Sequence, residues 1–426
     1  MNNQQYPLPE GWEWKPLSSL ATIVSGGTPS REVPDFWEPP LHAWVTPTDI
    51  TGKSGRFLFD AKERISDVGL SNSSATMLPI GTILMTSRAT LGEAKIARIP
   101  CCTNQGFKSL VPKRDVPSEY LYYLLQLFKE KYQKLGIGST FLEVNKKDTE
   151  KFLLPVAPPS LRPKIANILC ELDDHIDSTL ELIGKYEVTK QGLMADLFSR
   201  GIDPVTGKFR PSLQDAPERY HKTSIGWLPK EWNVVALQDI SSVERGKFTH
   251  RPRDDQKCYG GKHPFIQTGD VSACDGGVLS QYKQTLSDFG RSVSKSFPAG
   301  TIAVTIAANI ADTAILNSEM CFPDSVVGII VNNDAACNRF VELCIRMNKG
   351  MLDARAPQSA QKNINLEDLR PLLVPFPSIT EQVMIGARYD SLADHISNLK
   401  LEQQKLQVQK AGLMRDLLTG KVPVSA

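Results

Sequence analysis

Apolar side chains recur at alternating spacings of three and four in two segments of the chain, 160–199 and 378–419. A repeat of about 3.5 residues keeps one face of a helix turned toward a partner helix. The pattern therefore predicts two long helices that pair with each other as an antiparallel coiled coil, with polar seam members fixing the register. The predicted seam positions are Ile176, Thr179, Ile183, Tyr186, Lys190, Leu193 and Leu197 in the first helix, and Ile396, Leu399, Gln403, Leu406, Lys410, Leu413 and Leu417 in the second.

The two helical segments belong to a duplication that runs along nearly all of the 426 residues. GLMADLFSRG at 192–201 returns as GLMRDLLTGK at 412–421, and LPEGWEWKPLSSL at 8–20 returns as LPKEWNVVALQDI at 228–240. LPIGTILMTS at 78–87 returns as FPAGTIAVTI at 297–306. The chain therefore consists of two copies of one domain-sized unit, with a period too long for a solenoid.

Each copy begins with short β-like runs between turn residues and ends with one of the long helices. This order predicts an α+β fold with two globular domains, each followed by a helix, and a pseudo-two-fold internal duplication. Proline-rich elbows, at 152–163 and 372–382, join each globule to its helix. The predicted boundaries are a first globular domain at 1–158, a first helix at 159–200, a linker at 201–226, a second globular domain at 227–376, a second helix at 377–420 and a C-terminal tail at 421–426.

Composition narrows the possible classes of protein. A net charge of +2 permits nucleic-acid binding without indicating it. The eight cysteines and six histidines are dispersed and form no C-x-x-C pair, so we expect reduced thiols and no metal site. The chain has no apolar run of about 18 residues and no visible export signal, and we therefore expect a cytoplasmic protein outside the membrane.

Motifs of catalytic chemistry are missing from the sequence. It contains no G-x-x-x-x-G-K-[ST] phosphate loop. The stretches EPPL at 38–41 and APPS at 157–160 lack the amide and the aromatic ring of an adenine methyltransferase motif. EAK at 93–95 imitates the acid–x–Lys of nuclease sites, but its counterpart DTA at 312–314 has no lysine. We therefore expect no catalytic residues and no cofactor bound by this chain.

Several stretches resemble the specificity subunit of type I restriction–modification systems. They are the opening LPEGWEWKPLSSLATIVSGGTP, WVTPTDI, MTSRATLGEAKI, TNQGFKSLVP, the elbow PFPSITEQVMI and the final GLMRDLLTGKV, which together span nearly the whole chain. One departure is visible at the elbows, where the second copy keeps Glu381 and Gln382 but the first has Arg162 and Pro163. This difference argues against one shared role for these polar residues in both halves.

The resemblance implies a noncatalytic DNA-reading subunit. Each globule would be a target-recognition domain that reads one half of an asymmetric, bipartite site in double-stranded DNA. The paired helices would space the two domains and dock two methyltransferase subunits, which bind S-adenosylmethionine and methylate adenine N6. Restriction subunits that translocate DNA would join them, so ATP and Mg are expected on partners. The alternatives are a structural adaptor that does not read DNA sequence and a self-sufficient methyltransferase.

Polar and basic residues beside turns are the candidate DNA contacts. Arg88 is the preferred base-reading residue, because arginine can bond guanine O6 and N7 together. Asn104 and Gln105 suit adenine, whereas Lys108 and Lys146 suit phosphates. Asp49 and Asp270 are expected to brace their loops. The full set of candidates is Thr46, Thr48, Ser87, Arg88, Thr90, Asn104, Gln105, Lys108, Ser139, Thr140 and Lys146 in the first copy, and Arg251, Arg253, Gln267, Thr268, Asn309, Ser325, Ser359 and Lys362 in the second.

The seam residues have two possible roles. Ile176, Ile183, Tyr186, Leu193 and Leu197, with Ile396, Leu399, Leu406, Leu413 and Leu417, could pair the helices or dock a partner subunit. We favour one helix face for internal pairing and another face for docking.

Overall fold

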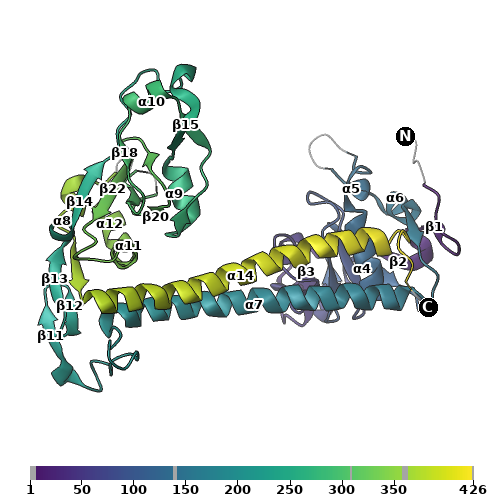
Figure 1. The fold of residues 1–426 in the computed structure, drawn as a ribbon. Coiled ribbons are helices and arrows are strands. Elements are labelled where there is room, and N and C mark those ends of the chain that lie inside the picture. Colours follow the sequence, from purple (N-terminus) through teal and green to yellow (C-terminus); the bar gives the residue numbers. More distant parts are fainter. Residues whose placement is uncertain (1–5, 138–141, 308, 357–362, 425–426) are drawn as a thin grey trace. The chain divides into compact units, whose positions relative to one another are not determined.

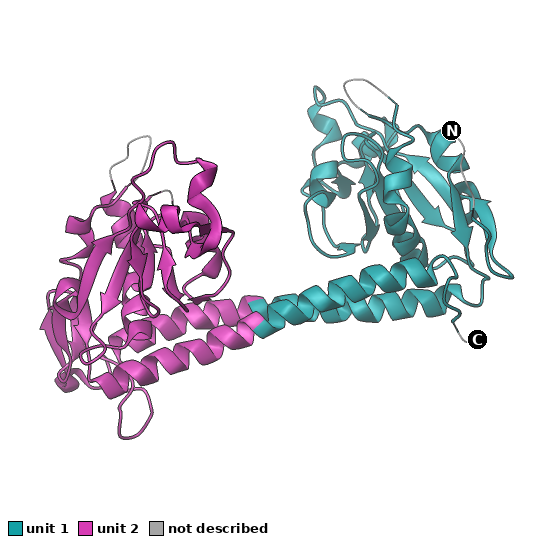
Figure 2. Cartoon of the chain, turned by 45° about the horizontal axis from the view of Figure 1, so that its top comes forward, with its two compact units in different colours: residues 1–183, 398–426 teal, residues 184–397 magenta. Residues whose placement is uncertain are grey.

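The computed structural model describes residues 6–137, 142–307, 309–356 and 363–424 (Figure 1). The chain forms two compact units, of which unit 1 comprises Met1–Ile183 and Asn398–Ala426, and unit 2 comprises Gly184–Ser397 (Figure 2). Each unit therefore contains the globular domain of one copy and segments of both long helices. This arrangement confirms the predicted α+β class, with two repeated domains that are each followed by a long helix.

Unit 1 contains a five-stranded sheet with the order β2-β9-β6-β7-β4, a three-stranded sheet β5-β3-β8 and the pair β1-β10. Residues 83–86 of β6 and 107–110 of β9 are buried on both faces of the sheet, including the polar Lys108 and Ser109 of β9. The strands are β1 Glu13–Pro16, β2 Ala21–Ser25, β3 His42–Val45, β4 Phe57–Leu58, β5 Glu63–Ile65, β6 Ile83–Thr86, β7 Ala94–Ala97, β8 Cys102–Thr103, β9 Phe107–Pro112 and β10 Leu153–Val156. The helices are α1 Leu17–Leu20, η1 Pro34–Phe36, α2 Pro47–Ile50, α3 Asp67–Ser71, α4 Ser118–Leu127, α5 Lys129–Gln133 and α6 Lys146–Lys151.

Unit 2 repeats this topology. Its five-stranded sheet has the matching order β14-β22-β19-β20-β16, next to a four-stranded sheet β17-β15-β21-β18 and the pairs β13-β23 and β11-β12. The strands are β11 Tyr220–Thr223, β12 Gly226–Pro229, β13 Asn233–Ala236, β14 Ser241–Arg245, β15 Tyr259–Phe265, β16 Val278–Leu279, β17 Gln284–Leu286, β18 Ser296–Phe297, β19 Ile302–Thr305, β20 Thr313–Leu316, β21 Met320–Cys321, β22 Val326–Val331 and β23 Leu373–Phe376. The helices are η2 Pro217–Arg219, α8 Leu237–Ile240, η3 Gln256–Cys258, α9 Thr268–Cys274, α10 Asp288–Ser292, α11 Asn338–Met347, α12 Lys349–Arg355 and α13 Leu366–Leu369.

The two long helices are α7 Arg162–Ser199, with 38 residues, and α14 Ile379–Leu417, with 39. In unit 1, Ile165 of α7 shares a core with Leu417 of α14, while Asp173, further along α7, contacts Lys410, which precedes Leu417. In unit 2, the rings of Tyr186 and His395 lie 4.6 Å apart. The helices therefore run antiparallel in each unit, as predicted.

The predicted seam agrees with the burial pattern of both helices. Every one of the fourteen positions is buried or half-buried, whereas positions 404, 405, 407, 408 and 409 between seam members are exposed. Exposure at Val408 reaches 74 %, although its side chain is apolar. The 3.5-residue spacing, and not hydrophobicity alone, therefore decides which side chains the helix pair covers.

The end of each long helix packs into the globular domain of the other copy. Leu417 and Leu418, at the end of α14, lie in the core of unit 1 with Leu17 and Leu20. Leu197 and Phe198, at the end of α7, lie in the core of unit 2. The repeated segment, 192–201 and 412–421, therefore supplies apolar side chains to the core of the globular domain of the other copy.

A glycine with positive φ follows each helix end. Gly201 has a φ of +64° and Gly420 a φ of +71°, values that favour glycine. A Cβ on Gly201 would lie 2.3 Å from Trp232, and a Cβ on Gly420 would lie 2.8 Å from the matching tryptophan, Trp12. Both glycines thus let the chain turn directly against a tryptophan of the domain that receives the helix.

Residues 201–226, predicted as a linker, fold onto unit 2. Arg210 is 7 % exposed and forms two bonds with the buried Glu381, with 2.5 Å from Nη1 to Oε1 and 2.9 Å from Nη2 to Oε2. Glu381 also accepts hydrogen bonds from the Ile202 N–H and the Trp232 indole. The charges and turn residues of this segment predicted an open linker. The sequence around Arg210 gave no sign of its partner, because Glu381 lies 171 residues away.

Candidate nucleic-acid interface

Four segments of unit 1 meet at the end of the five-stranded sheet where β6 ends and β9 begins. They are residues 45–51, 87–93, 104–106 and 142–145, which we call the loop cluster of unit 1. The Asn104 N–H donates to the Val45 carbonyl at 3.0 Å, and the Ser87 N–H donates to the Gly106 carbonyl at 2.7 Å. The Val144 N–H donates to the Ser87 carbonyl at 3.0 Å. Main-chain bonds therefore bring together most of the positions that sequence analysis selected in the first copy.

Arg88 is an exposed cation of this loop cluster. Its Nε lies 2.9 Å from Oε2 of Glu143, and its side chain is 45 % exposed. The backbones of Arg88 and Glu143 also pair in an isolated antiparallel bridge. The turn behind Arg88 contains Ala89, with a φ of +57°, so the hairpin holds this residue in a left-handed conformation. Sequence analysis missed Glu143, although it stands within a stretch that was selected for its polar residues.

Lys108 and Ser87 lie beneath Arg88 and are buried, with 6 % and 0 % exposure. The Lys108 ammonium lies 3.3 Å from Ser87 Oγ and 3.7 Å from Oε1 of Glu143. Burial lowers the pKa of Lys108, and the Glu143 charge opposes that effect. The two side chains support the loops from within, and this position does not suit the direct phosphate contact that we expected of Lys108.

Asp49 braces the segment after β3, as predicted. Its Oδ2 accepts hydrogen bonds from the Thr46 N–H at 2.8 Å and the Thr46 hydroxyl at 2.9 Å. Thr48, two residues later, is exposed, and its hydroxyl oxygen lies 2.9 Å from the Thr46 hydroxyl oxygen. Thr90 contacts Thr51 at 3.1 Å between hydroxyl oxygens, and this contact joins two segments of the loop cluster.

The remaining candidates of unit 1 have different environments. Asn104 accepts a hydrogen bond from the Gly106 N–H at 2.9 Å and so shapes its own turn. Gln105 is exposed and bonds the Thr28 hydroxyl. Lys146 begins α6, with a side chain that is 51 % exposed and lies 3.9 Å from Glu150. Ser139, Thr140, Ser359 and Lys362 lie outside the described residues.

The corresponding loops of unit 2 keep the same main-chain frame. Ala307 and Asn363 form the bridge that matches Arg88 and Glu143. The Ile364 N–H donates to the Ile306 carbonyl at 3.0 Å, and the Ile306 N–H donates to the Ser325 carbonyl at 3.1 Å. The frame is therefore common to both domains, whereas its side chains differ between them.

The polar candidates of unit 2 are also engaged with their own loops. The Gln267 N–H donates to Asp270 Oδ2 at 2.9 Å, which repeats the brace of the first copy. The Gln267 side-chain amide donates to Gln284 Oε1 at 2.6 Å. Thr268 follows as the first residue of α9. The Asn309 amide donates to Ser272 Oγ at 3.2 Å and is exposed.

Two arginines of the loop after β14 present cations in unit 2. Arg253 is half exposed and lies 3.0 Å from Asp324 Oδ1. Arg251 is exposed and donates to the carbonyls of Phe248 and His250 at 2.9 and 2.8 Å. Arg253 therefore links the loop after β14 to the segment 322–325, which contains the candidate Ser325.

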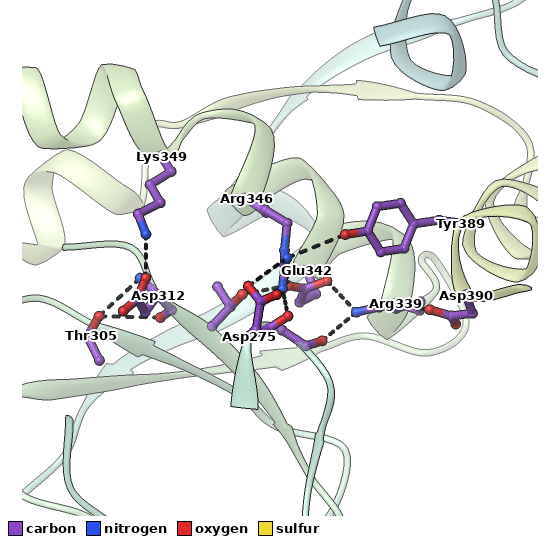
Figure 3. Close-up of polar contacts among 11 residues, drawn as sticks. Asp275, Thr305, Asp312, Arg339, Glu342, Arg346, Lys349, Tyr389 and Asp390 are labelled. Atoms are coloured by element: carbon purple, nitrogen blue, oxygen red, sulfur yellow. Dashed lines mark hydrogen bonds and ion pairs between the residues drawn. The ribbon is translucent and has the colours of Figure 1, made fainter. Parts of the chain in front are cut away.

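Buried ionic networks attach each globule to the helices, and sequence analysis did not find them. In unit 2, Glu342 of α11 is fully buried and forms ion pairs with Arg339 and Arg346 (Figure 3). Arg339 also contacts Asp390 of α14 at 2.5 Å, so the network extends from α11 to the long helix. The spacing of Arg339, Glu342 and Arg346 at three and four residues is a signal that could have identified it.

The elbows show how the departure from the family pattern is accommodated. The Arg162 side chain donates to the Ala157 carbonyl at 2.9 Å, and the Gln382 side chain donates to the equivalent Pro377 carbonyl at 3.0 Å. Arg162 additionally reaches Asp115, at 2.6 Å between Nη1 and Oδ2. Arg162 and Gln382 therefore brace their elbows in the same way, whereas the ionic role of Glu381 is confined to the second copy.

Metal-binding groups and membrane-spanning helices are both missing from the described ranges. These residues contain no group of His, Cys, Asp and Glu side chains that is arranged to hold a metal ion. The same part of the chain contains no helix with the length and apolarity that a membrane span requires.

Comparisons with known proteins identify the family. A model of the type I restriction modification DNA specificity domain matches residues 9–185 and again residues 229–409. The type I restriction enzyme MjaIX specificity subunit of Methanocaldococcus jannaschii is 30 % identical over 263 residues, which are 61 % of this chain and 58 % of that protein. The putative MjaX specificity subunit of the same organism is 23 % identical over 429 residues, with 98 % of this chain and 95 % of that protein covered.

Solved structures share the fold. The S subunit of a type I restriction–modification system from M. genitalium has a TM-score of 0.60 and 14 % identity, with 100 % of this chain and 98 % of that chain covered. A chain from a structure concerned with complex assembly and conformational transition of the type I R-M system has a TM-score of 0.59 and 17 % identity, with 98 % and 100 % covered. Two copies of the family domain, in a chain whose topology is duplicated, show that this protein belongs to the type I restriction–modification specificity subunits.

Proposed function

We propose that this chain reads an asymmetric, bipartite DNA site, with one half-site for each globular domain. The observation that carries the proposal is the pair of matching loop frames with unlike side chains. Unit 1 presents Arg88 and Glu143 where unit 2 presents Ala307 and Asn363 on the same main-chain bridge. Because base edges are distinguished by the donors and acceptors that meet them, two such surfaces suit two different base sequences.

The proposed role requires no chemistry from this chain. Two adenine-N6 methyltransferase subunits would bind S-adenosylmethionine and carry out methylation, and restriction subunits would use ATP and Mg. The duplicated helices support two equivalent docking places, because each copy supplies one helix. Apolar side chains that the seam leaves outside, such as Val188 at 69 % exposure in unit 2 and Val408 at 74 % in unit 1, suit contacts with a partner.

The experiment that tests this function measures DNA affinity with the modification subunits present. A random duplex and selected bipartite duplexes are compared across a series of salt concentrations. A sequence reader is expected to prefer its site by about a thousandfold or more, above a salt-dependent nonspecific affinity. Equal affinity for all duplexes would support the structural adaptor instead, and methyl transfer by the isolated chain would support a self-sufficient enzyme.

A further inference from the structure

We propose that Glu143 is a positioning residue for DNA recognition, and that it aims the Arg88 guanidinium at a guanine in one half-site. This inference rests on the proposed function. Oε2 of Glu143 lies 2.9 Å from Nε of Arg88, and neither Nη group donates a hydrogen bond to a residue in the described parts of the chain. A bidentate contact with guanine O6 and N7 requires two N–H donors in a fixed plane, which the terminal groups provide.

Glu143 is itself anchored to the sheet. Its second oxygen, Oε1, lies 3.7 Å from the ammonium of Lys108, and Lys108 is held at the strand β9 with a side chain that is 7 % exposed. The carboxylate therefore connects a buried cation, which cannot move away, to an exposed one, which otherwise could. A free arginine loses rotamer entropy when it is fixed, and this arrangement removes part of that loss before DNA arrives.

The second domain shows that these charges are not needed for the loops to fold. By strand register, Val327 stands in the place of Lys108, because β22 pairs with β19 as β9 pairs with β6. Ile306, Ala307 and Asn363 replace Ser87, Arg88 and Glu143, and the main-chain bridge and the following hydrogen bond remain. Unit 2 thus keeps the main-chain contacts although it lacks equivalents of Arg88, Lys108 and Glu143. We infer that these three charges serve a role other than folding the loops.

The net charge of this group also suits a nucleic acid. Two cations and one carboxylate leave one positive charge, so Glu143 lowers the general attraction to phosphate while it orders Arg88. Removal of its charge by Glu143→Gln should therefore raise affinity for random duplex DNA and lower discrimination between bases. Damage to the fold would lower both quantities, so these opposite changes separate positioning from structural support.

The test uses the complete chain with its modification subunits and a library of duplexes with randomised sequence. Base preference is measured at every position for the wild type, Glu143→Gln, Arg88→Ala and the double variant. Glu150→Gln is the matched control, because it removes the same charge from a nearby residue of α6 that contacts Lys146 and not Arg88. The preference for the other half-site reports in each case that the protein is folded.

We expect Glu143→Gln to reduce discrimination by about fivefold to a hundredfold at the base position that Arg88→Ala affects. The double variant should match Arg88→Ala alone, because both changes act on one contact. Lys108→Met, which releases Glu143 without removing it, should weaken the same position. Unchanged base preference in Glu143→Gln, while Arg88→Ala loses it, would overturn the inference and leave the proposed function intact. A wild-type complex without any base preference would overturn the proposed function itself.

Discussion

Lys410 of α14 lies against Asp173 of α7, with 2.5 Å between the ammonium Nζ and the carboxylate Oδ1. The Tyr123 hydroxyl of α4 donates to Oδ2 of the same carboxylate at 2.7 Å, and the Arg56 guanidinium approaches it to 3.9 Å. One carboxylate therefore connects both long helices to the globular domain of unit 1. In unit 2 the buried carboxylate is that of Glu342, which lies on the globule and is connected to α14 through Arg339 and Asp390.

Removal of the Asp173 carboxylate should destabilise unit 1. Asp173→Ala leaves Lys410 without its carboxylate and removes the acceptor 2.7 Å from the buried Tyr123 hydroxyl. Breaking a buried ion pair from one side costs about 3–5 kcal/mol. Asp60→Ala in the same unit is the control, because Asp60 and its partner Arg64 are 70 % and 40 % exposed and the change should cost about 1 kcal/mol or less. Urea unfolding of the two variants checks the difference, and equal losses would show that Asp173 has no special role.

Shortening a buried side chain at the end of α14 should lower the stability of unit 1. Leu417 is 5 % exposed and packs in the core of unit 1, so Leu417→Ala should cost about 2–5 kcal/mol. Val408→Ala, on the exposed side of the same helix, should change stability by about 0.5 kcal/mol or less. Thermal unfolding monitored on unit 1 distinguishes these outcomes. A tolerated Leu417→Ala would mean that the domain of the first copy is complete without the second helix.

The first elbow should respond to acid. The hydrogen bond from Arg162 holds the pKa of Asp115 below its ordinary value of 3.8. A lowered folded-state pKa contributes stability above pH 3.8, and that contribution is lost as the pH falls through the lowered value. We therefore expect Asp115→Asn to be less stable than the wild type near neutrality, and the difference to disappear in acid. Unfolding measured over a pH series tests this, and a difference that grows as the pH falls would contradict it.

Arg88 and Arg253 should affect different halves of the DNA site. Arg88→Ala is expected to cost about 1–3 kcal/mol of binding and to loosen one base position in the first half-site. Arg253→Ala removes a half-exposed cation from unit 2 and should leave that half-site unchanged. Competition binding with duplexes altered in one half-site at a time checks both variants. If Arg88→Ala weakens binding equally on every sequence, Arg88 contacts phosphate and not a base.

Local patterns in the sequence were sufficient for the helices and for the duplication. The 3.5-residue spacing depends only on neighbours along one helix, so the seam from Ile176 to Leu197 could be placed without knowledge of the fold. The strand-forming runs of both copies were likewise visible as β-branched segments between turns. Antiparallel pairing was expected because the two copies are equivalent and this direction gives each helix pair one globule at either end.

Contacts between distant segments could not be predicted. Arg210 pairs with Glu381, which lies 171 residues away in the sequence. Residues 201–226 were therefore predicted as an open linker, although they pack against unit 2. Lys108 was expected to contact phosphate, but its side chain is buried on β9 and lies 3.7 Å from the carboxylate of Glu143. The selected loops did converge around Arg88, whereas its ion-pair partner Glu143 was overlooked because DNA contacts were sought among cations and amides.

The central claim is that each globular domain reads its own half of the target. It is tested most directly by mapping methylated adenines in cells that express this chain with its modification subunits, and again with Arg88→Ala. We predict two short specified sequences separated by a fixed run of unspecified bases, and relaxation of only one of them in the variant. A single uninterrupted motif, or relaxation of both halves by Arg88→Ala, would contradict the claim.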